Sequence, residues 1–550
     1  MTGAETSSPF KGEAGRGMGP APFKGEAGRG MGQAHLKGKA RNERATTTHA
    51  TSSSPSASLL LMHRRTLWIT AALALVAAIA IYGVIMVPRA STEAIGSIAV
   101  LPFQTKSADT DTDYLADGLA ETLIYQLSQV PKIKVTPASS VFRYKGKDVD
   151  PLKVGAELGV AAVMTGRLVQ RGESLSISVE LVDVRNSKSL WGEKYERKLA
   201  DLLATQREIA TEIARKLQLN LSGESARLLT KRFTDNNEAY QLYLKGQYQY
   251  AKRGQENLTR AIDFFQQAVR LDPSFAKAHV ALADTYSIAA FNGHLNSKEV
   301  LPLAAAAAER ALAIDPALAE AHAAKASVAA MDWRWEDARR GFARAIELNP
   351  DIAETRFRYG LLYLIPMKRA EEAILEIRRA TELEPQAIVM AAVLTRGYLA
   401  AGKTRLALEQ AKKTYALDPD HVTTLSWLMM ANYAAGNYAE TLELVGKLRK
   451  SFPTFAAVWA VTAYMKIGKP ENAKRELRAV LDNPGLQNNA LAIGLMMAAA
   501  GNRDEAFAAF ERAYAAKEIR LVYLQSDLPT ESLRSDPRFV DLMKRIGLPE

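Results

Sequence analysis

A proline-ended triplet recurs through the second half of the chain at an almost constant spacing. The triplets LDP, IDP, LNP, LEP, LDP and SFP follow one another at intervals of 43, 34, 35, 34 and 34 residues. Proline ends a helix because it lacks the amide donor and restricts the residue before it. A period near 34 residues with amphipathic helices predicts stacked helix hairpins that bury their apolar faces against their neighbours. The prolines are Pro273, Pro316, Pro350, Pro385, Pro419 and Pro453.

Small residues recur at two positions of these units. Alanine stands twelve residues before the proline in five of the six units and five residues before it in four. Side chains of this size let the two helices of a hairpin approach closely. Two further units without the proline, at 454–485 and 488–517, bring the total to about eight. The glycines expected at turns between helices are Gly402, Gly436, Gly468 and Gly501.

Residues 238–518 resemble the tetratricopeptide repeat family. The stretches DWRWEDARRGFARAIELNP (332–350) and LRSDPRFVDLMKRIGL (533–548) are especially similar to repeats that accompany TolB-like amino-terminal domains. The resemblance implies a superhelix whose first helices line a concave wall that binds an extended peptide or a partner helix, with residues 519–550 as a C-terminal cap. The family geometry gives five candidates for groove contacts: Glu320, Phe357, Arg396, Met430 and Tyr433.

The assignment of positions within the repeats predicts the effects of two substitutions. Ala338→Leu is expected to destabilise the array, because the added bulk enters a close helix–helix contact. Arg396→Ala is expected to weaken partner binding and to leave stability nearly unchanged. Trp333 and Trp335, at a turn between helices, are interpreted as packing residues.

Residues 96–220 predict a compact α/β domain. The residues Arg171-Gly172-Glu173 join two alternating segments, which is a hairpin signal. The stretches SIAVLPF, YLADGLAETLIYQLSQV, VGAELGV, MTGRLVQRGESLSISVELVDV and LWGEKYERKLADLLATQREIATEIARKL together resemble the TolB amino-terminal-like (FlgO-like) domain, which lies in the periplasm in TolB. In other bacterial proteins this domain follows a kinase, cyclase or winged-helix head, which this chain lacks. The predicted strands are 98–103, 133–136, 160–170 and 174–184, and the predicted helices are 114–129, 151–158 and 200–219.

An apolar stretch at 66–88, TLWITAALALVAAIAIYGVIMVP, carries no charge. A helix needs about 20 residues to cross a bilayer, so this one is long enough. A cleaved signal peptide and a buried core helix are the alternatives, but Val87-Pro88-Arg89 lacks a small-x-small cleavage site. The stretch therefore predicts an uncleaved anchor in a bacterial inner membrane. Because basic residues precede it, the N-terminus is expected in the cytoplasm and residues 89–550 in the periplasm.

The first 65 residues are basic and poor in large apolar side chains. Ten Lys and Arg and four Glu give them a net charge of +6 out of the chain's +11. The eleven residues PFKGEAGRGMG occur twice without a difference, at 9–19 and 22–32. Residues 1–65 are therefore expected to be a disordered tail, or the natural start is Met62. The weak remaining charge and the lack of a basic stripe predict no nucleic-acid partner.

The sequence offers no enzyme motif. The absence of cysteine excludes disulfides and thiolate chemistry, and no GxSxG, Walker or HExxH pattern occurs. The run DTDTD at 109–113 lacks the glycine and glutamate of a calcium loop, so Asp113 is expected to cap the following helix. We expect no catalytic, cofactor-binding or metal-ligating residue and no small-molecule substrate. The histidines after residue 88, interpreted as structural, are His279, His294, His322 and His421.

The expected fold is multidomain: one transmembrane helix, a small α/β domain and an all-α tetratricopeptide superhelix. The expected function is a non-enzymatic, membrane-anchored scaffold of the bacterial envelope that binds a protein or peptide on the repeat groove. The alternative is the sensor part of a signalling or transcription-regulating system whose catalytic or DNA-binding head is missing or acts in trans.

Overall fold

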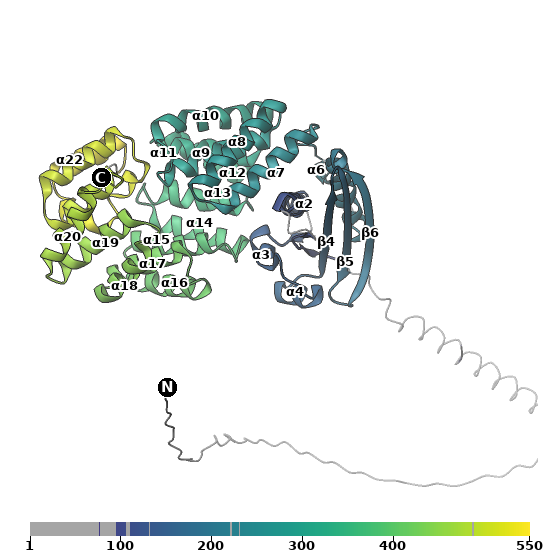
Figure 1. Cartoon of the computed structure of the whole chain (residues 1–550), viewed down its shortest axis with the longest axis horizontal. Coiled ribbons are helices and arrows are strands. Elements are labelled where there is room, and N and C mark those ends of the chain that lie inside the picture. The colour runs from purple at the N-terminus through teal and green to yellow at the C-terminus, as the bar shows by residue number, and fades with distance from the viewer. Residues whose placement is uncertain are drawn as a thin grey trace, which may run out of the picture. The chain divides into compact units, whose positions relative to one another are not determined.

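A computed structural model describes residues 95–105, 110–130, 133–219, 223–229, 231–486 and 489–549, together with Val76. The chain divides into two units, residues 1–91 and 92–550 (Figure 1). The predicted tail at 1–65, with the alternative start at Met62, lies outside the described residues. The helices and strands named below belong to the second unit.

The predicted fold class needs one correction, the membrane helix. Among the described residues no helix has both the length and the apolar character that a bilayer crossing requires. The highly apolar helix α21 (Ala490–Ala500), for example, has 11 residues, whereas a span needs about 20. Residues 66–88, apart from Val76, lie outside the described part of the chain. The architecture shown is a small α/β domain followed by an array of helices.

The α/β domain is built on a mixed sheet with the strand order β3-β1-β4-β5-β6, and β2 extends the pairing along β4. Strands β3, β1 and β4 are parallel, and β4, β5 and β6 are antiparallel. The strands are β1 (Ser97–Val100), β2 (Gln104–Thr105), β3 (Lys134–Val135), β4 (Ala162–Arg171), β5 (Ser174–Asp183) and β6 (Lys188–Lys198).

The strand β6 was not predicted from the sequence. Along its 11 residues only Trp191 and Tyr195 are buried, because it is the edge strand and most of its side chains face solvent. The β4–β5 hairpin is confirmed, with Gly172 at φ 58° in its turn.

Helices α2 and α5 pack against each other and against the sheet. The prediction that Asp113 caps a helix is wrong, because α2 begins three residues earlier. Asp113 accepts instead a hydrogen bond from Thr105 Oγ1 at 3.0 Å. The helical segments of this part are α2 (Thr110–Ser128), α3 (Ala138–Val141), η1 (Phe142–Tyr144), α4 (Pro151–Leu158), η2 (Leu199–Asp201), α5 (Leu202–Lys216) and α6 (Gly223–Leu229).

Eight consecutive helix hairpins follow within the described part of residues 237–515 (Figure 1). Their first helices are α7 (Asn237–Lys252), α9 (Ala276–Phe291), α11 (Ala319–Met331), α13 (Ala353–Arg358) with the π-helical turn η3 (Tyr359–Leu364), α15 (Ile388–Ala400), α17 (Val422–Ala434), α19 (Pro453–Lys466) and α21. Their second helices are α8 (Gln255–Leu271), α10 (Ser297–Ile314), α12 (Trp335–Leu348), α14 (Ala370–Leu383), α16 (Thr404–Leu417), α18 (Tyr438–Leu448), α20 (Pro470–Leu481) and α22 (Arg503–Ala515). The chain ends with η4 (Ile519–Tyr523), η5 (Leu528–Leu533) and α23 (Pro537–Ile546).

The turns between paired helices use the left-handed backbone region. The four predicted turn glycines have φ between 69° and 85°. In the third hairpin Trp333 takes this place at φ 63°, a conformation that costs energy for a bulky residue. Its contacts with the end of the chain, described below, hold it there.

The first repeat packs directly on the α/β domain through α2 and α7. Gly118 makes this approach close, because a Cβ there would lie 2.5 Å from Leu244 Cδ2. A buried polar chain also crosses the junction: Tyr240 of α7 donates to Gln206 Oε1 of α5 at 2.6 Å. Thr122 Oγ1 of α2 lies 2.9 Å from the same tyrosine hydroxyl. The α/β domain thus covers the first hairpin, which otherwise has no preceding repeat to pack against.

We expect Tyr240→Phe to lower the free energy of unfolding by about 1–3 kcal/mol, because it leaves the buried Gln206 oxygen without its donor. Urea denaturation followed by circular dichroism measures the change. Tyr248→Phe on the same helix is the matched control, since its hydroxyl has no hydrogen-bond partner in the described part of the chain. Equal effects of the two substitutions would show that the polar chain contributes nothing.

Candidate functional site

A cavity of about 320 Å³ lies along the first helices of the first four hairpins. Helices α7, α9, α11 and α13 each contribute side chains, and both charged and aromatic groups line it. Its residues are Tyr243, Gln247, Tyr250, Arg253, Lys277, Val280, Ala281, Asp284, Glu320, Glu354 and Arg358.

Arg358 is the central charge of the cavity. Its side chain is 13% exposed and ion-pairs with Asp284 of α9 and with Glu354, one turn earlier on α13. Burial opposes the charge of Arg358, but the two carboxylates outweigh it and hold the pKa of the guanidinium above its ordinary value. Burial raises the pKa of Asp284, and Arg358 limits the rise. The pair therefore ties α9 to α13 across the cavity wall.

Lys277 connects this wall to the α/β domain. Its ammonium lies 2.8 Å from the ring centroid of Tyr125 in α2 and 4.4 Å from that of Phe233. Glu320 of α11 is 3.9 Å away. Burial lowers the pKa of Lys277 to about 8, and the charge of Glu320 counteracts the fall. The two aromatic rings hold the cation in place beside the opening.

The later part of the same wall is covered by the end of the chain. Arg396 of α15 is paired with Asp527 at 3.2 Å, and its guanidinium lies 3.8 Å from the ring centroid of Tyr523. The Tyr523 hydroxyl donates to the carbonyl of Leu361 in η3 at 3.1 Å. The N–H of Ile365, the usual α-helical donor to Leu361, donates instead to the carbonyl of Gly360, and Pro366 has no N–H, so the carbonyl of Leu361 is available for this bond. The segment 519–533 thus lies against the first helices of the fourth and fifth hairpins, and it also contacts α9 of the second hairpin and α21 of the eighth.

A second set of contacts joins the third hairpin to the end of the chain. The Trp335 indole donates to the carbonyl of Ile546 at 2.8 Å. The Trp333 ring stacks on Tyr514 with centroids 5.3 Å apart, and Lys517 pairs with Asp332 beside it. Both tryptophans therefore pack, as interpreted from the sequence.

The five predicted groove residues have different surroundings. Glu320 lines the cavity, and Arg396 contacts the chain's own segment 519–533. Phe357, Met430 and Tyr433 are buried among apolar neighbours, at 9%, 8% and 5% exposed. Their role in partner binding stays a prediction. For Arg396 the expected effect of alanine on stability changes, because its side chain is only 12% exposed and ion-paired.

Sequence reasoning missed most of the cavity, although a signal was present. Lys277, Glu320 and Glu354 each stand four residues after the proline of a triplet, and all three line the cavity. Two of these first helices, α9 and α11, also carry histidines with a structural contact. His279 Nε2 and His322 Nε2 lie 3.1 and 2.9 Å from the carbonyls of Pro273 and Pro316. These contacts fix the loops that enter the helices.

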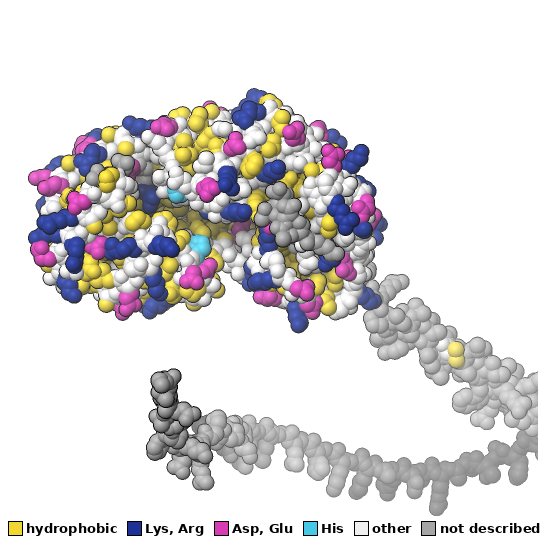
Figure 2. Space-filling model, viewed as in Figure 1, with side chains coloured by type: hydrophobic (Ala, Val, Ile, Leu, Met, Phe, Trp, Pro, Cys, Tyr) yellow, Lys and Arg dark blue, Asp and Glu magenta, His cyan; other side chains and the backbone are white. Residues whose placement is uncertain are grey.

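The described residues contain no group of three or more His, Asp and Glu side chains placed to hold a metal ion. Figure 2 shows basic and acidic side chains interspersed over the visible face of the second unit, without a continuous basic stripe. The cavity itself is lined by charges of both signs, three basic and three acidic side chains.

Residues 93–212 match a family model described as the second domain of a HilA/YgeH-like transcriptional regulator. This stretch is the α/β domain, for which the sequence suggested the TolB-like family. The putative adenylate cyclase 3 of Rhizobium meliloti (strain 1021) is 33% identical over 187 residues, which are 34% of this chain and 32% of that protein. The chain thus spans about a third of the length of this curated relative.

Three solved structures are similar to parts of this chain. The tetratricopeptide repeat protein from Parabacteroides merdae is 15% identical with a TM-score of 0.35, over 48% of this chain and 100% of that one. YrrB, described as a TPR protein with an unusual peptide-binding site, is 20% identical with a TM-score of 0.26, over 35% and 95%. Yeast Tom70 is 14% identical with a TM-score of 0.37, over 79% and 85%. At TM-scores this low, the description as helix hairpins rests on the chain's own helices.

Proposed function

We propose that this chain is a protein-interaction scaffold that binds a peptide segment of a partner in the cavity along α7, α9, α11 and α13. The observation that carries the proposal is the contrast between the two parts of the wall. The later part is covered by segment 519–533, whereas the cavity of about 320 Å³ is open and lined by six charged side chains.

The chemistry of the cavity suits a peptide. Tyr243, Tyr250 and Val280 offer apolar contact, and Glu320 and Glu354 offer acceptors for backbone amides or basic side chains. Arrays of stacked helix hairpins present such extended surfaces, and peptide recognition uses a few pockets of this kind along a wall.

Photo-crosslinking in cells tests the site. We expect a photoreactive amino acid at Glu354, whose side chain is 42% exposed on the cavity, to give discrete adducts with a partner. The same amino acid at Leu303, which is 51% exposed on the second helix α10, is the control and should give none of these adducts. Glu320→Gln should reduce the yield at 354. Equal adducts from both positions, or none from 354, would contradict the proposal.

A second candidate function is the regulatory part of a signalling system whose output protein is separate. The match of residues 93–212 to a domain of a transcriptional regulator, and the partial similarity to a putative adenylate cyclase, favour it. Transcript profiles and cyclic AMP levels in cells lacking the chain test this function. A change that the full chain restores would support it, and unchanged levels of both would count against it.

A further inference from the structure

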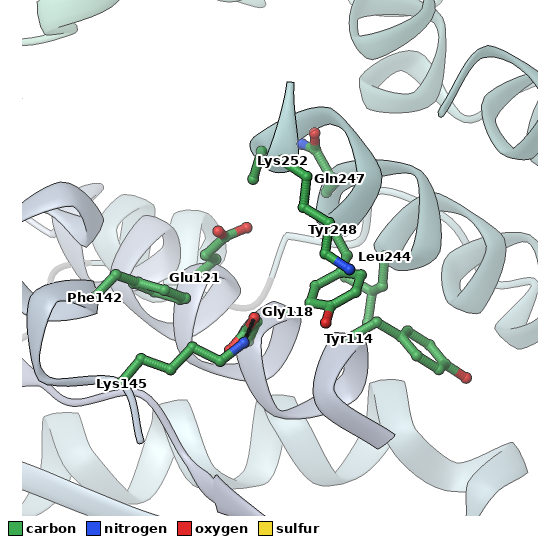
Figure 3. A pocket seen from close by; sticks show the side chains of 11 residues that line it. Tyr114, Gly118, Glu121, Phe142, Lys145, Leu244, Gln247, Tyr248 and Lys252 are labelled. Atoms are coloured by element: carbon green, nitrogen blue, oxygen red, sulfur yellow. Dashed lines mark hydrogen bonds and ion pairs between the residues drawn. The ribbon is translucent and has the colours of Figure 1, made fainter. Parts of the chain in front are cut away.

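A second pocket, of about 230 Å³, lies where the α/β domain meets the first repeat. Figure 3 shows Glu121, Phe142 and Lys145 on one side of it, with Gln247, Tyr248 and Lys252 of α7 on the other. The pocket is separate from the proposed peptide cavity, although Gln247 borders both.

The charges around this pocket are unevenly paired. Lys145 ion-pairs with Asp117 and lies 3.8 Å from Asp113, so one ammonium neutralises two carboxylates of α2. Lys252 lies 3.9 Å from the ring centroid of Tyr248. Glu121, one turn after Asp117 on the same face of α2, has no hydrogen bond or ion pair with any described residue.

A buried oxygen of Asp117 independently shows that this pocket lacks hydrogen-bond donors. Asp117 is 8% exposed, and one carboxylate oxygen accepts from Lys145. Its other oxygen, Oδ1, is buried and has no hydrogen-bond partner in the described part of the chain. The carboxylates of Asp117 and Glu121, on neighbouring turns of α2, thus line one pocket, and each has an oxygen that accepts no hydrogen bond from a described residue. A buried acceptor without a donor costs free energy, so a ligand that donates to it is stabilised.

The remaining walls suit an organic cation. Phe142 and Tyr248 present rings to the pocket, and the Tyr248 ring has the ammonium of Lys145 at 5.2 Å and that of Lys252 at 3.9 Å. Aromatic faces and carboxylates together recognise ammonium groups. We propose that this pocket binds a small primary amine carrying one positive charge, with Glu121 as its ion-pair partner and Asp117 Oδ1 as a second acceptor.

The pocket also makes binding depend on pH. Burial, aided by the charge of Asp117, raises the pKa of Glu121 to about 7, and Lys145 opposes the rise. Tyr240 and Tyr243 of α7 face the same carboxylate, and neither carries a charge near neutral pH. A cationic amine binds the ionised form of Glu121, so its affinity should rise by about tenfold between pH 6 and pH 8.

Isothermal titration of the full chain with tyramine tests the proposal, with 4-ethylphenol as the same molecule lacking its amine. Tyramine should bind at least about tenfold more tightly than 4-ethylphenol, since the charge-assisted contact is worth that much or more. Glu121→Gln should weaken tyramine binding by about tenfold and remove its pH dependence. Glu180→Gln, at an exposed position of β5, is the matched control and should change neither.

Lys252→Met gives a test in the opposite direction. Removing this ammonium from the Tyr248 ring takes away a competing cation, so tyramine binding should become tighter. Thermal melts with tyramine check that each variant is folded and that bound ligand raises the melting temperature. Equal affinity for tyramine and 4-ethylphenol, unchanged binding by Glu121→Gln, or no binding to the wild type would each overturn the proposal. None of these results bears on the peptide cavity, which the photo-crosslinking at 354 tests separately.

Discussion

Replacing Arg396 with alanine is expected to lower the free energy of unfolding by about 3 kcal/mol, because it leaves the largely buried carboxylate of Asp527 without its ion-pair partner. The guanidinium side chain is 12% exposed and that of Asp527 is 18% exposed, so water replaces little of the lost contact. The cation–π contact with Tyr523 is lost as well. Urea denaturation of the full chain measures the change.

The matched control for Arg396 is Arg379→Ala. Arg379 pairs with two carboxylates, Asp351 and Glu382, whereas Arg396 pairs with one, but the side chain of Arg379 is 48% exposed. Surface pairs of this kind contribute about 0–1 kcal/mol. If Arg396→Ala destabilises the chain no more than Arg379→Ala does, segment 519–533 is not held on the repeat wall as the structure has it.

Trp335→Ala is expected to cost about 3 kcal/mol and to loosen the end of the chain from the third hairpin. The indole packs beside Tyr363 and Gly547 and donates its N–H to the carbonyl of Ile546. Hydrogen exchange should show the amides of α23 losing protection before those of α19 and α20, because damage in a stacked array is local first.

Trp335→Phe separates packing from hydrogen bonding. The phenyl ring keeps part of the apolar contact but cannot donate to Ile546, so we expect a smaller loss of about 1–2 kcal/mol. If Trp335→Ala lowered hydrogen-exchange protection equally in all hairpins, the contact between Trp335 and Ile546 would not hold the end of the chain locally on the third hairpin.

Much of the fold follows from local patterns in the sequence. The period of the prolines and small residues depends on contacts within a hairpin and with its neighbours, which every unit repeats, so the number of hairpins and the turn glycines could be predicted. The β4–β5 hairpin could be predicted because its residues alternate. The edge strand β6 could not, since only Trp191 and Tyr195 of its side chains reach the core.

The site was less predictable, because contacts distant in the sequence decide it. Arg396 and Asp527 are 131 residues apart, and Trp335 and Ile546 are 211 apart. No periodic pattern records such pairings, so the sequence indicated a repeat wall with Arg396 on it but not that the chain's own end covers that place. The sequence by itself determined the helix hairpins and most of the sheet, through local periodicity. Only the tertiary structure decided which part of the repeat wall is left uncovered. The reason is that segment 519–533 is held on the wall by the ion pair between Arg396 of α15 and Asp527, which are distant in the sequence.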